Sequence, residues 1–258
     1  MPAQVNSTGW GTRAIHDLLY RAIPDSKFGD RCLLRTLALL GRGQIKAVFG
    51  LEHVTAANDP FILVLNHSTR REALLVPTVL TLYRGGRLIH FMADWNYRLI
   101  PGVGLIYRRA QTITVTRKPA RPRILNLLKP LYLKESTVLA RARSLLDTGR
   151  SVGIFPEGRV NRNHSQLLRG RTGAAYLSLK TGVPIIPAGI RLPDACPGRD
   201  PPRGPLEICI GHPLRPPSAR SSPISVADLR AWHTVIMRKI SLLSGKAWSL
   251  GQEWSDVR

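Results

Sequence analysis

The chain has 258 residues, a formal net charge of +22 and an isoelectric point near 11.3. This length suffices for one large α/β domain or two small ones with a substantial buried core. Its longest apolar stretches fall well short of the roughly 20 residues that span a bilayer, which argues against an integral membrane protein. Most of the basic residues are arginine. Because guanidinium matches phosphate, nucleic acid, anionic lipid and phosphorylated substrates are all candidate partners.

The chain contains three cysteines, Cys32, Cys196 and Cys209, which show no paired spacing. This spacing argues against a disulfide framework and against a zinc site, so we expect no bound metal. The amino terminus lacks the basic region and apolar run that are typical of a secretion signal. We therefore expect the protein to work in the cytoplasm.

The first segment, residues 1–43, is predicted to be helical, with helices over 13–23 and 32–40. In the second helix the apolar side chains share one face that arginines flank, which makes a basic amphipathic element. The face consists of Leu33, Leu34, Leu37 and Leu40, and the flanking residues are Arg31, Arg35 and Arg42. Two interpretations are open: the helix packs over the core, or it docks on an anionic membrane surface.

Strands and helices alternate over the remainder of the chain, residues 44–258. Strands are predicted near 45–50, 60–66, 87–93, 112–117, 151–155, 184–191 and 205–211. Helices are predicted near 72–83, 98–109, 135–147 and 171–181, and a final helix begins at a capping box formed by Ser225 and Asp228. Such alternation implies crossover connections. We therefore expect an α/β domain with a mostly parallel or mixed central sheet flanked by helices.

The stretch from Pro60 to Glu72 reads PFILVLNHSTRRE. Its unbroken apolar run predicts a strand buried on both faces, with His67 in the turn that follows and Glu72 in the first turn of a helix. A carboxylate in this position can accept a hydrogen bond from the imidazole and orient it as a general base. Taken alone, the spacing favours a buried histidine at the end of a strand that is bonded to its neighbours. Other motifs are needed to distinguish this structural role from a catalytic one.

Three further groups of residues follow or bound predicted strands. Thr116-Arg117-Lys118 places cations where a phosphate could be held. In FPEGR, residues 155–159, Glu157 could hold a hydroxyl and Arg159 a phosphate, while Gly158 allows close approach of the backbone. In VPIIP, residues 183–187, two prolines mark the ends of a short strand. Each group also fits an ordinary surface or structural turn.

These groups, in this order, resemble the four sequence blocks of the glycerolipid acyltransferase family, which includes the PlsC-like 1-acylglycerol-3-phosphate acyltransferases. The blocks are NHSTRRE at 66–72, Arg117, FPEGR at 155–159 and VPIIP at 183–187. The first block contains the motif HX4E, where the family usually has HX4D. The resemblance covers residues 49–192, which is more than half of the chain.

The resemblance implies transfer of a fatty acyl group from acyl-CoA or acyl-carrier protein to the hydroxyl of a lysophospholipid such as 1-acylglycerol-3-phosphate, in phospholipid biosynthesis. It implies no cofactor beyond this co-substrate, and a peripheral position on the anionic inner face of the membrane. His67 would be the general base, and Glu72 would orient it. The site for the phosphate and glycerol of the acceptor would consist of Arg117, Glu157, Gly158 and Arg159. The block with Pro184 and Pro187 would border the acyl donor.

Two positions depart from the family pattern. Glu72 replaces the usual aspartate, which adds one methylene and changes the geometry of the pair by about 1 Å. The third block usually reads Glu-Gly-Thr-Arg, but here Arg159 follows Gly158 directly and Val160 stands where an arginine is expected. Either Arg159 or Arg162 then binds the phosphate, or the acceptor lacks a phosphate in that place.

Two alternative hypotheses belong to other classes of protein. The basic charge also fits a nucleic-acid-binding protein whose histidine block is fortuitous, although nucleic acid is not the partner that we favour. Glu72 and the altered third block also fit a lipid-binding member of the family that has lost catalysis. Arg70 and Arg71 have three interpretations: they keep His67 neutral, they bind phosphates of the donor, or they lie exposed on a loop.

Overall fold

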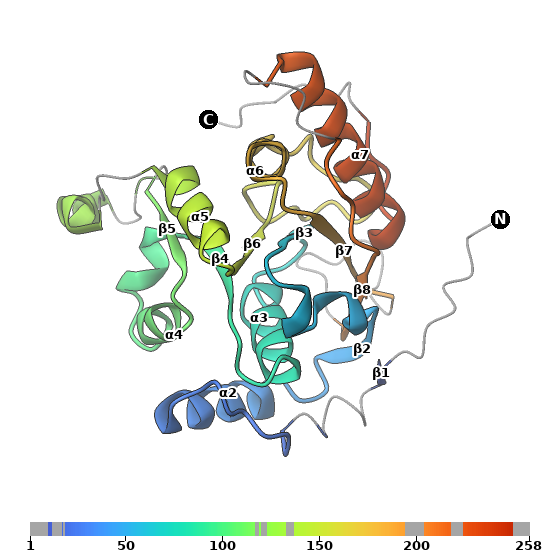
Figure 1. The fold of residues 1–258 in the computed structure, drawn as a ribbon. Helices are drawn as coiled ribbons and strands as arrows, with labels where there is room; N and C mark the ends of the chain where they lie inside the picture. The colour runs from blue at the N-terminus through green and yellow to red at the C-terminus, as the bar shows by residue number, and fades with distance from the viewer. Residues whose placement is uncertain are drawn as a thin grey trace.

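The computed structural model describes residues 10–11, 17, 19–116, 119, 123–132, 137–193, 204–217 and 224–249. They form an eight-stranded sheet with helices on both of its faces (Figure 1). The strands are β1 (Trp10–Gly11), β2 (Ile45–Phe49), β3 (Ile62–Leu65), β4 (Ile89–Asp94), β5 (Ile113–Val115), β6 (Ser151–Ile154), β7 (Ile185–Arg191) and β8 (Leu206–Ile210). Their order in the sheet is β1-β2-β8-β7-β3-β6-β4-β5. The predicted α/β fold with a mixed sheet is confirmed.

The centre of the sheet is parallel. Strand β3 pairs in parallel with β7 on one side and with β6 on the other, and β4 and β5 continue the parallel run. Strand β8 is antiparallel to β7 and parallel to β2, whereas β1 is antiparallel to β2. The carboxyl ends of β3 to β7 therefore point the same way, and the residues that follow these strands meet at one edge, where α/β proteins bind ligands.

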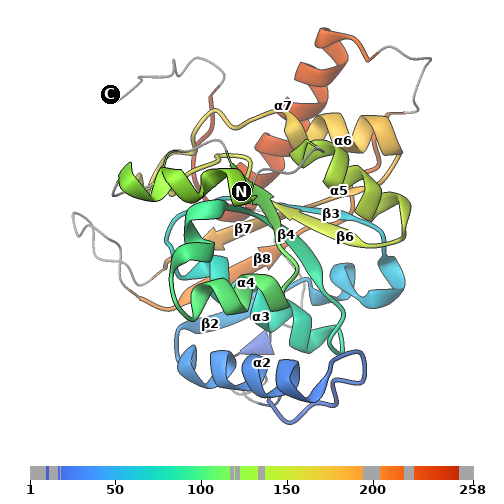
Figure 2. The same ribbon diagram turned by 90° about the vertical axis from the view of Figure 1, so that its left-hand side faces the viewer.

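Two hydrophobic cores sandwich the sheet. The α-helices are α2 (Phe28–Leu40), α3 (Glu72–Tyr83), α4 (Val103–Arg109), α5 (Val138–Asp147), α6 (Gly173–Thr181) and α7 (Val226–Ser244). Leu63 and Leu65 of β3 pack with α3 in one core, and Ile62 and Val64 pack with α5, α6 and α7 in the other. Figures 1 and 2 show the same division, with α2 and α3 on one side of the sheet and α6 and α7 on the opposite side. This alternation explains the unbroken apolar run in the sequence.

Short 3-10 helices complete the connections between strands and helices. They are η1 (Leu51–Val54), η2 (Ala56–Asn58), η3 (Trp95–Leu99) and η4 (Arg123–Tyr132). The helix predicted over 98–109 is therefore replaced by η3 and the shorter α4, because Gly102 between them has a φ of 78°, which a helix does not accept. Helix η4 was not predicted at all.

Each of the seven predicted strands is present, and Ser225 is confirmed as the cap of the last helix, because its Oγ accepts a hydrogen bond of 3.0 Å from the Asp228 amide. The prolines of the VPIIP block do not both mark strand ends, because Pro187 lies inside β7. The antiparallel pairing of β7 with β8 begins only at Ala188, so the missing N–H of Pro187 costs that ladder nothing.

Two predicted helices differ from the structure. The helix expected over 135–147 begins at Val138, where Thr137 Oγ1 caps the amide of Ala140 at 3.2 Å. Of the helix expected over 13–23, residues 13–16 and 18 lie outside the described residues; residue 17 is helical, and residues 19–23 are not.

Helix α2 lies over α3 with an unusually open surface. Its start at Phe28 is earlier than predicted, and none of its residues is fully buried. Leu34 and Ala38 pack against the core, whereas the side chain of Leu40 is exposed, contrary to its predicted place on the packed face. Packing over the core is thus confirmed for part of the helix, and docking on a membrane stays a prediction, as does a domain division at residue 43. Within the described part of the chain, no helix is both long enough and apolar enough to cross a membrane.

Candidate active site

His67 and Glu72 form a hydrogen-bonded pair at the carboxyl end of β3. His67 follows the strand, Glu72 is the first residue of α3, and His67 Nδ1 lies 2.9 Å from Glu72 Oε1. The other carboxylate oxygen of Glu72 accepts hydrogen bonds of 2.9 Å from both the amide and the hydroxyl of Thr69. Both oxygens are engaged and the side chain is fully buried, so the orientation of the carboxylate is fixed. The carboxylate holds the proton on Nδ1, which leaves Nε2 as the basic nitrogen.

The loop that carries His67 is held to the sheet by Asn66. Its side-chain oxygen accepts a hydrogen bond of 2.7 Å from the Ile190 amide, and its side-chain nitrogen donates to the Ile190 carbonyl at 3.1 Å and to Ser68 Oγ at 3.0 Å. Asn66 is completely buried. It therefore fixes the end of β3 against β7, a role that its place beside His67 did not reveal.

Glu157 lies behind His67 and does not line the cleft. Its Oε1 accepts a hydrogen bond of 2.9 Å from the His67 amide, and its Oε2 accepts bonds from Asn161 Nδ2 at 2.7 Å and from the Leu168 amide at 2.9 Å. Burial raises the pKa of this carboxyl, and the three hydrogen bonds oppose the rise. With both oxygens engaged by the protein, this geometry favours a positioning role for Glu157 over the predicted contact with the acceptor.

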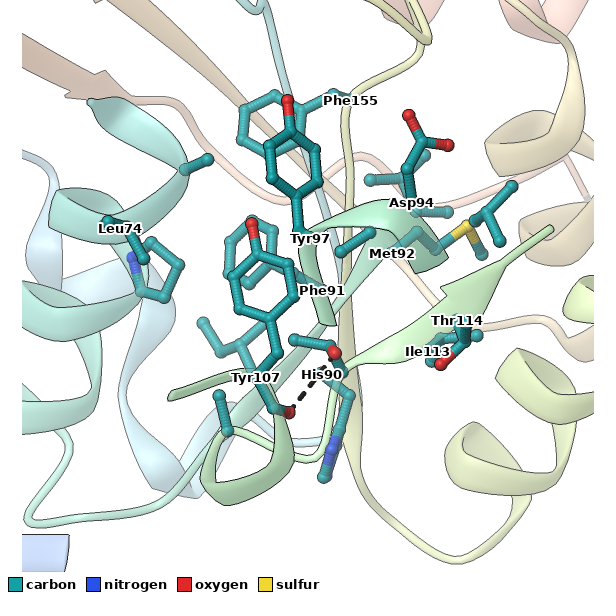
Figure 3. A pocket seen from close by; sticks show the side chains of 18 of the residues that line it. Leu74, His90, Phe91, Met92, Asp94, Tyr97, Tyr107, Ile113, Thr114 and Phe155 are labelled. Atoms are coloured by element: carbon teal, nitrogen blue, oxygen red, sulfur yellow. Dashed lines mark hydrogen bonds between the residues drawn. The ribbon is translucent and has the colours of Figure 1, made fainter. Parts of the chain in front are cut away.

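Phe155 stacks on the imidazole of His67, with ring centroids 4.4 Å apart and an angle of 29° between the planes. Phe91 follows at 5.7 Å from Phe155. Phe155 thus covers one face of the imidazole, and both phenylalanines line a cleft (Figure 3). Sequence reasoning did not single out either phenylalanine, because an aromatic residue in a strand is more often a core residue.

A large cleft of about 2540 Å³ opens beside His67. Its walls come from α2, α3, α4, α5, β4, β5, the loop after β6 and the start of α6. Tyr97 and Tyr107 lie near Phe91 on its wall (Figure 3), and burial raises the pKa of Tyr107 to about 12. Typical small-molecule pockets have volumes of roughly 300–1,000 Å³. This cleft is large enough for two substrates, one of which has a long apolar part.

Guanidinium groups line the same cleft. They belong to Arg70, Arg71, Arg98, Arg109, Arg141, Arg159, Arg162, Arg169 and Arg171. Gly158, with a φ of 68°, turns the backbone where FPEGR ends, and a Cβ there would lie 2.9 Å from Arg171 Nε. The glycine thus lets Arg171 lie against the turn that exposes Arg159. Such a density of cations beside an apolar wall suits a ligand with an anionic head and an apolar chain.

The remaining predicted site residues have different outcomes. Arg117 lies outside the described residues. Pro184 and Pro187 are not among the residues that line the cleft, so their predicted place beside the acyl donor stays a prediction. Arg71 Nη2 donates to the Gly204 carbonyl at 3.0 Å, so it is not simply an exposed loop residue. Within the described ranges, no group of three or more histidine, cysteine, aspartate or glutamate side chains has a geometry that could hold a metal ion.

A family model for Acyltransferase matches residues 47–191. The fold is similar to the crystal structure of the 1-acyl-sn-glycerophosphate (LPA) acyltransferase PlsC from Thermotoga maritima, with a TM-score of 0.52 and 21% sequence identity, over 92% of this chain and 81% of that chain. Comparison with curated proteins finds no significant sequence match. The fold and the matched sequence thus define an acyltransferase of the α/β class. The chain belongs to the Acyltransferase family, whose model matches more than half of it.

Proposed function

We propose that the protein moves a fatty acyl group from acyl-CoA or acyl-carrier protein to the hydroxyl of a lysophospholipid, such as 1-acylglycerol-3-phosphate, in phospholipid biosynthesis. The observation that carries this proposal is the His67–Glu72 hydrogen bond of 2.9 Å at the wall of a cleft that is both apolar and rich in arginine. The intact pair favours an active enzyme over a lipid-binding protein that has lost catalysis.

In the proposed reaction, His67 Nε2 takes the proton of the acceptor hydroxyl while Glu72 stabilises the charged imidazole. The hydroxyl oxygen attacks the thioester carbonyl, the C–S bond breaks, and the thiol leaves with the proton that His67 returns. General-base catalysis of this kind contributes roughly 10²- to 10⁴-fold in rate. The products are the acylated lipid and free CoA or carrier-protein thiol.

Arg159 is the residue that we assign to the phosphate of the acceptor, next to the turn at Gly158. Arg117, which lies outside the described residues, stays a predicted member of the same site. Arg159 is exposed and lines the cleft. It follows Glu157 closely in the chain, and the Glu157 carboxylate accepts a hydrogen bond from the His67 amide. Replacing Arg159 by Gln should raise KM for lysophosphatidate about tenfold and leave KM for monoacylglycerol, which has no phosphate, unchanged. Arg215→Gln, at an exposed position that does not line the cleft, is the matched control.

We also propose that the side of the molecule formed by α2, α4 and η4 rests on an anionic membrane. Helices α2 and α4 are joined by the Asp30–Arg109 ion pair, and η4 lies on the same side (Figure 2). Large apolar side chains are exposed there: Phe28, Leu39, Leu40, Ile100, Leu105, Ile124, Leu127 and Leu128. Basic residues of these helices and the net charge of +22 complement acidic headgroups. A protein in this position would take lipid substrates from the cytoplasmic leaflet.

Product identification tests the proposed reaction. The protein is incubated with isotopically labelled palmitoyl-CoA or palmitoyl-carrier protein and, one at a time, with lysophosphatidate, glycerol 3-phosphate, other lysophospholipids or monoacylglycerol. Mass spectrometry should find the label in the diacyl product of lysophosphatidate. Label in the product of another acceptor would correct the acceptor class. The absence of labelled ester with every donor and acceptor would contradict the proposal.

A further inference from the structure

Lys246 is a buried cation immediately after α7, remote in sequence from every motif. Only 7% of the residue is exposed. Its Nζ donates hydrogen bonds to Ser68 Oγ at 2.9 Å and to the Asn163 carbonyl at 2.7 Å. Lysine is almost never buried to this degree unless an acidic group compensates its charge. Both direct partners are uncharged, so the compensation must come from groups further away.

The compensating groups are the two buried carboxylates of the site. Glu72 and Glu157 are 0% and 4% exposed. Burial lowers the pKa of Lys246, and the charges of Glu157 and Glu72 oppose this fall. Ser68 is the neighbour of His67 in the chain, and Glu157 holds the His67 amide. The ammonium group therefore belongs to the same polar cluster as the candidate base.

The backbone around Lys246 is built to hold the side chain in place. Gly245 ends α7 with a φ of 72°, a conformation that turns the chain back into the molecule. Ser241 Oγ donates to the Lys246 carbonyl at 2.6 Å. Ala247 then forms a bridge with Gln166, with hydrogen bonds of 2.7 and 2.8 Å to the flanking backbone. The end of α7 is thus tied to the loop that also supplies a hydrogen bond to Glu157.

We propose that Lys246 is a positioning residue of the acyltransferase site, which holds the His67 loop through Ser68 and offsets the charges of the two buried carboxylates, Glu72 and Glu157. This inference rests on the proposed function of His67 as the base. When all three are ionised, Glu72, Glu157 and Lys246 together carry a net charge of −1. Without the ammonium the same group carries −2, which favours the protonated imidazole in a variant that lacks the lysine.

The charged groups around the His67 loop come from several elements: Glu72 bonds the imidazole, Glu157 bonds the His67 amide, and Lys246 bonds the adjacent Ser68. Glu72 comes from α3, Glu157 from the turn after β6, and Lys246 from the end of α7. Guanidinium groups on the cleft wall near His67 belong to Arg70, Arg71, Arg159 and Arg162. A substitution at Lys246 keeps all of these arginines and both glutamates in the sequence. A changed titration of His67 in the variant therefore follows from the loss of the ammonium, either directly or through Glu157, whose pKa the charge of Lys246 lowers.

The test is a titration of the His67 ring by NMR, with its signal assigned from His67→Ala. In Lys246→Gln, which keeps a hydrogen-bond donor but loses the charge, the pKa of His67 should rise by about one unit. Lys239→Gln, which removes the same charge from an exposed position of the same helix, should shift it by less than about 0.3 unit. Equal pKa values of His67 in the two variants would overturn the proposal. If Lys246→Gln does not fold, Lys246→Met removes the charge without leaving an unpaired buried amide, and the same rise is expected.

The titration needs no catalytic activity, so its failure is distinct from failure of the proposed function. Where the enzyme is active, the acid limb of kcat/KM should move to higher pH in Lys246→Gln by the same amount, because the imidazole must be neutral to act as a base. Lys246→Arg, which retains the charge, should restore the limb of the parent. A loss of activity at all pH values with an unshifted limb would indicate a purely structural role and contradict the proposal.

Discussion

The extra methylene of Glu72 is accommodated by the start of α3. Glu72 is the first residue of the helix, and its side chain reaches back over the turn to His67 and Thr69. A carboxylate at this end of a helix is also favoured by the helix dipole. The pair therefore closes to 2.9 Å with glutamate in place of the aspartate that is usual in the family. The position of the carboxylate oxygen, rather than the length of the side chain, is what the imidazole requires.

Shortening this side chain tests the argument directly. Glu72→Asp should lower kcat about 10- to 100-fold, because the carboxylate withdraws by about 1 Å from both His67 and Thr69. The comparison is Glu52→Asp at an exposed position, where kcat should not change. Steady-state kinetics with thermal melts of each variant make the measurement. Full activity of Glu72→Asp would show that the fit of glutamate to this loop is irrelevant.

Among individual residues, the sequence predicted the candidate base and its carboxylate, but not the residues that hold them in place. His67 and Glu72 are close in the chain, and a strand followed by a turn and a helix brings them together. Asn66, Glu157 and Lys246 act through partners more than 80 positions away, as the bonds to Ile190, His67 and Ser68 show. Periodicity and spacing carry no information on such pairs. For this reason the sequence predicts a substrate contact for Glu157 and does not predict its bond to the His67 amide.

At the scale of elements, the site depends on how closely α7 packs on β7. Gly189 of β7 faces the end of α7, and a Cβ on it would lie 2.2 Å from the carbonyl carbon of Leu243 and 2.3 Å from the amide nitrogen of Ser244. Both atoms are backbone, so they cannot move aside as a side chain does. This contact fixes the position of the turn at Gly245, and hence the position of Lys246 next to the His67 loop.

Gly189→Ala should therefore destabilise the protein by at least about 2 kcal/mol, because the added methyl group forces α7 away from the sheet. Urea unfolding followed by circular dichroism provides the free energy of unfolding. Gly173→Ala is the control, since its Cβ would meet only Leu139 Cδ2 at 3.5 Å, an ordinary contact at the start of α6. An unchanged stability of Gly189→Ala would mean that the approach of α7 to β7 is not tight.

Most helices and strands were predictable from the sequence. An unbroken apolar run indicates a strand that is buried on both faces, and apolar residues at helical spacing indicate a helix that is buried on one face. The exceptions have physical causes. Gly102 divides the helix expected over 98–109, and Pro187 is tolerated inside β7 because it lies outside the β7–β8 ladder. Helix η4 was missed because it contains Pro130, which is unusual inside a helix; Ile124, Leu127 and Leu128 of this helix are exposed.

At the scale of the whole molecule, apolar and basic residues combine on the side formed by α2, α4 and η4. Side chains such as Phe28, Leu40 and Leu127 are 71–80% exposed there. A soluble surface alone does not require large apolar residues in such positions. A bilayer with acidic headgroups satisfies both features at once, because its interior accepts the apolar side chains and its surface attracts the arginines.

Vesicle sedimentation measures this association. The protein should bind vesicles that contain phosphatidylglycerol more tightly than vesicles of phosphatidylcholine, and binding should weaken as salt screens the charges. Leu127→Ser combined with Leu40→Ser should reduce binding about tenfold or more. Leu242→Ser is the matched control, because Leu242 is 70% exposed on α7, away from this side. Equal losses in both cases would contradict the proposed surface.

We propose His67 as the base of an acyl transfer to a lipid hydroxyl. The most direct test of this proposal is the release of free thiol from long-chain acyl-CoA or acyl-carrier protein, with and without lysophosphatidate, by the parent, His67→Ala and His164→Ala. His164 is exposed and does not line the cleft. Release should depend on the acceptor, fall at least about 10²-fold in His67→Ala and persist in His164→Ala. Thiol release that no acceptor stimulates, or that survives in His67→Ala, would contradict the account.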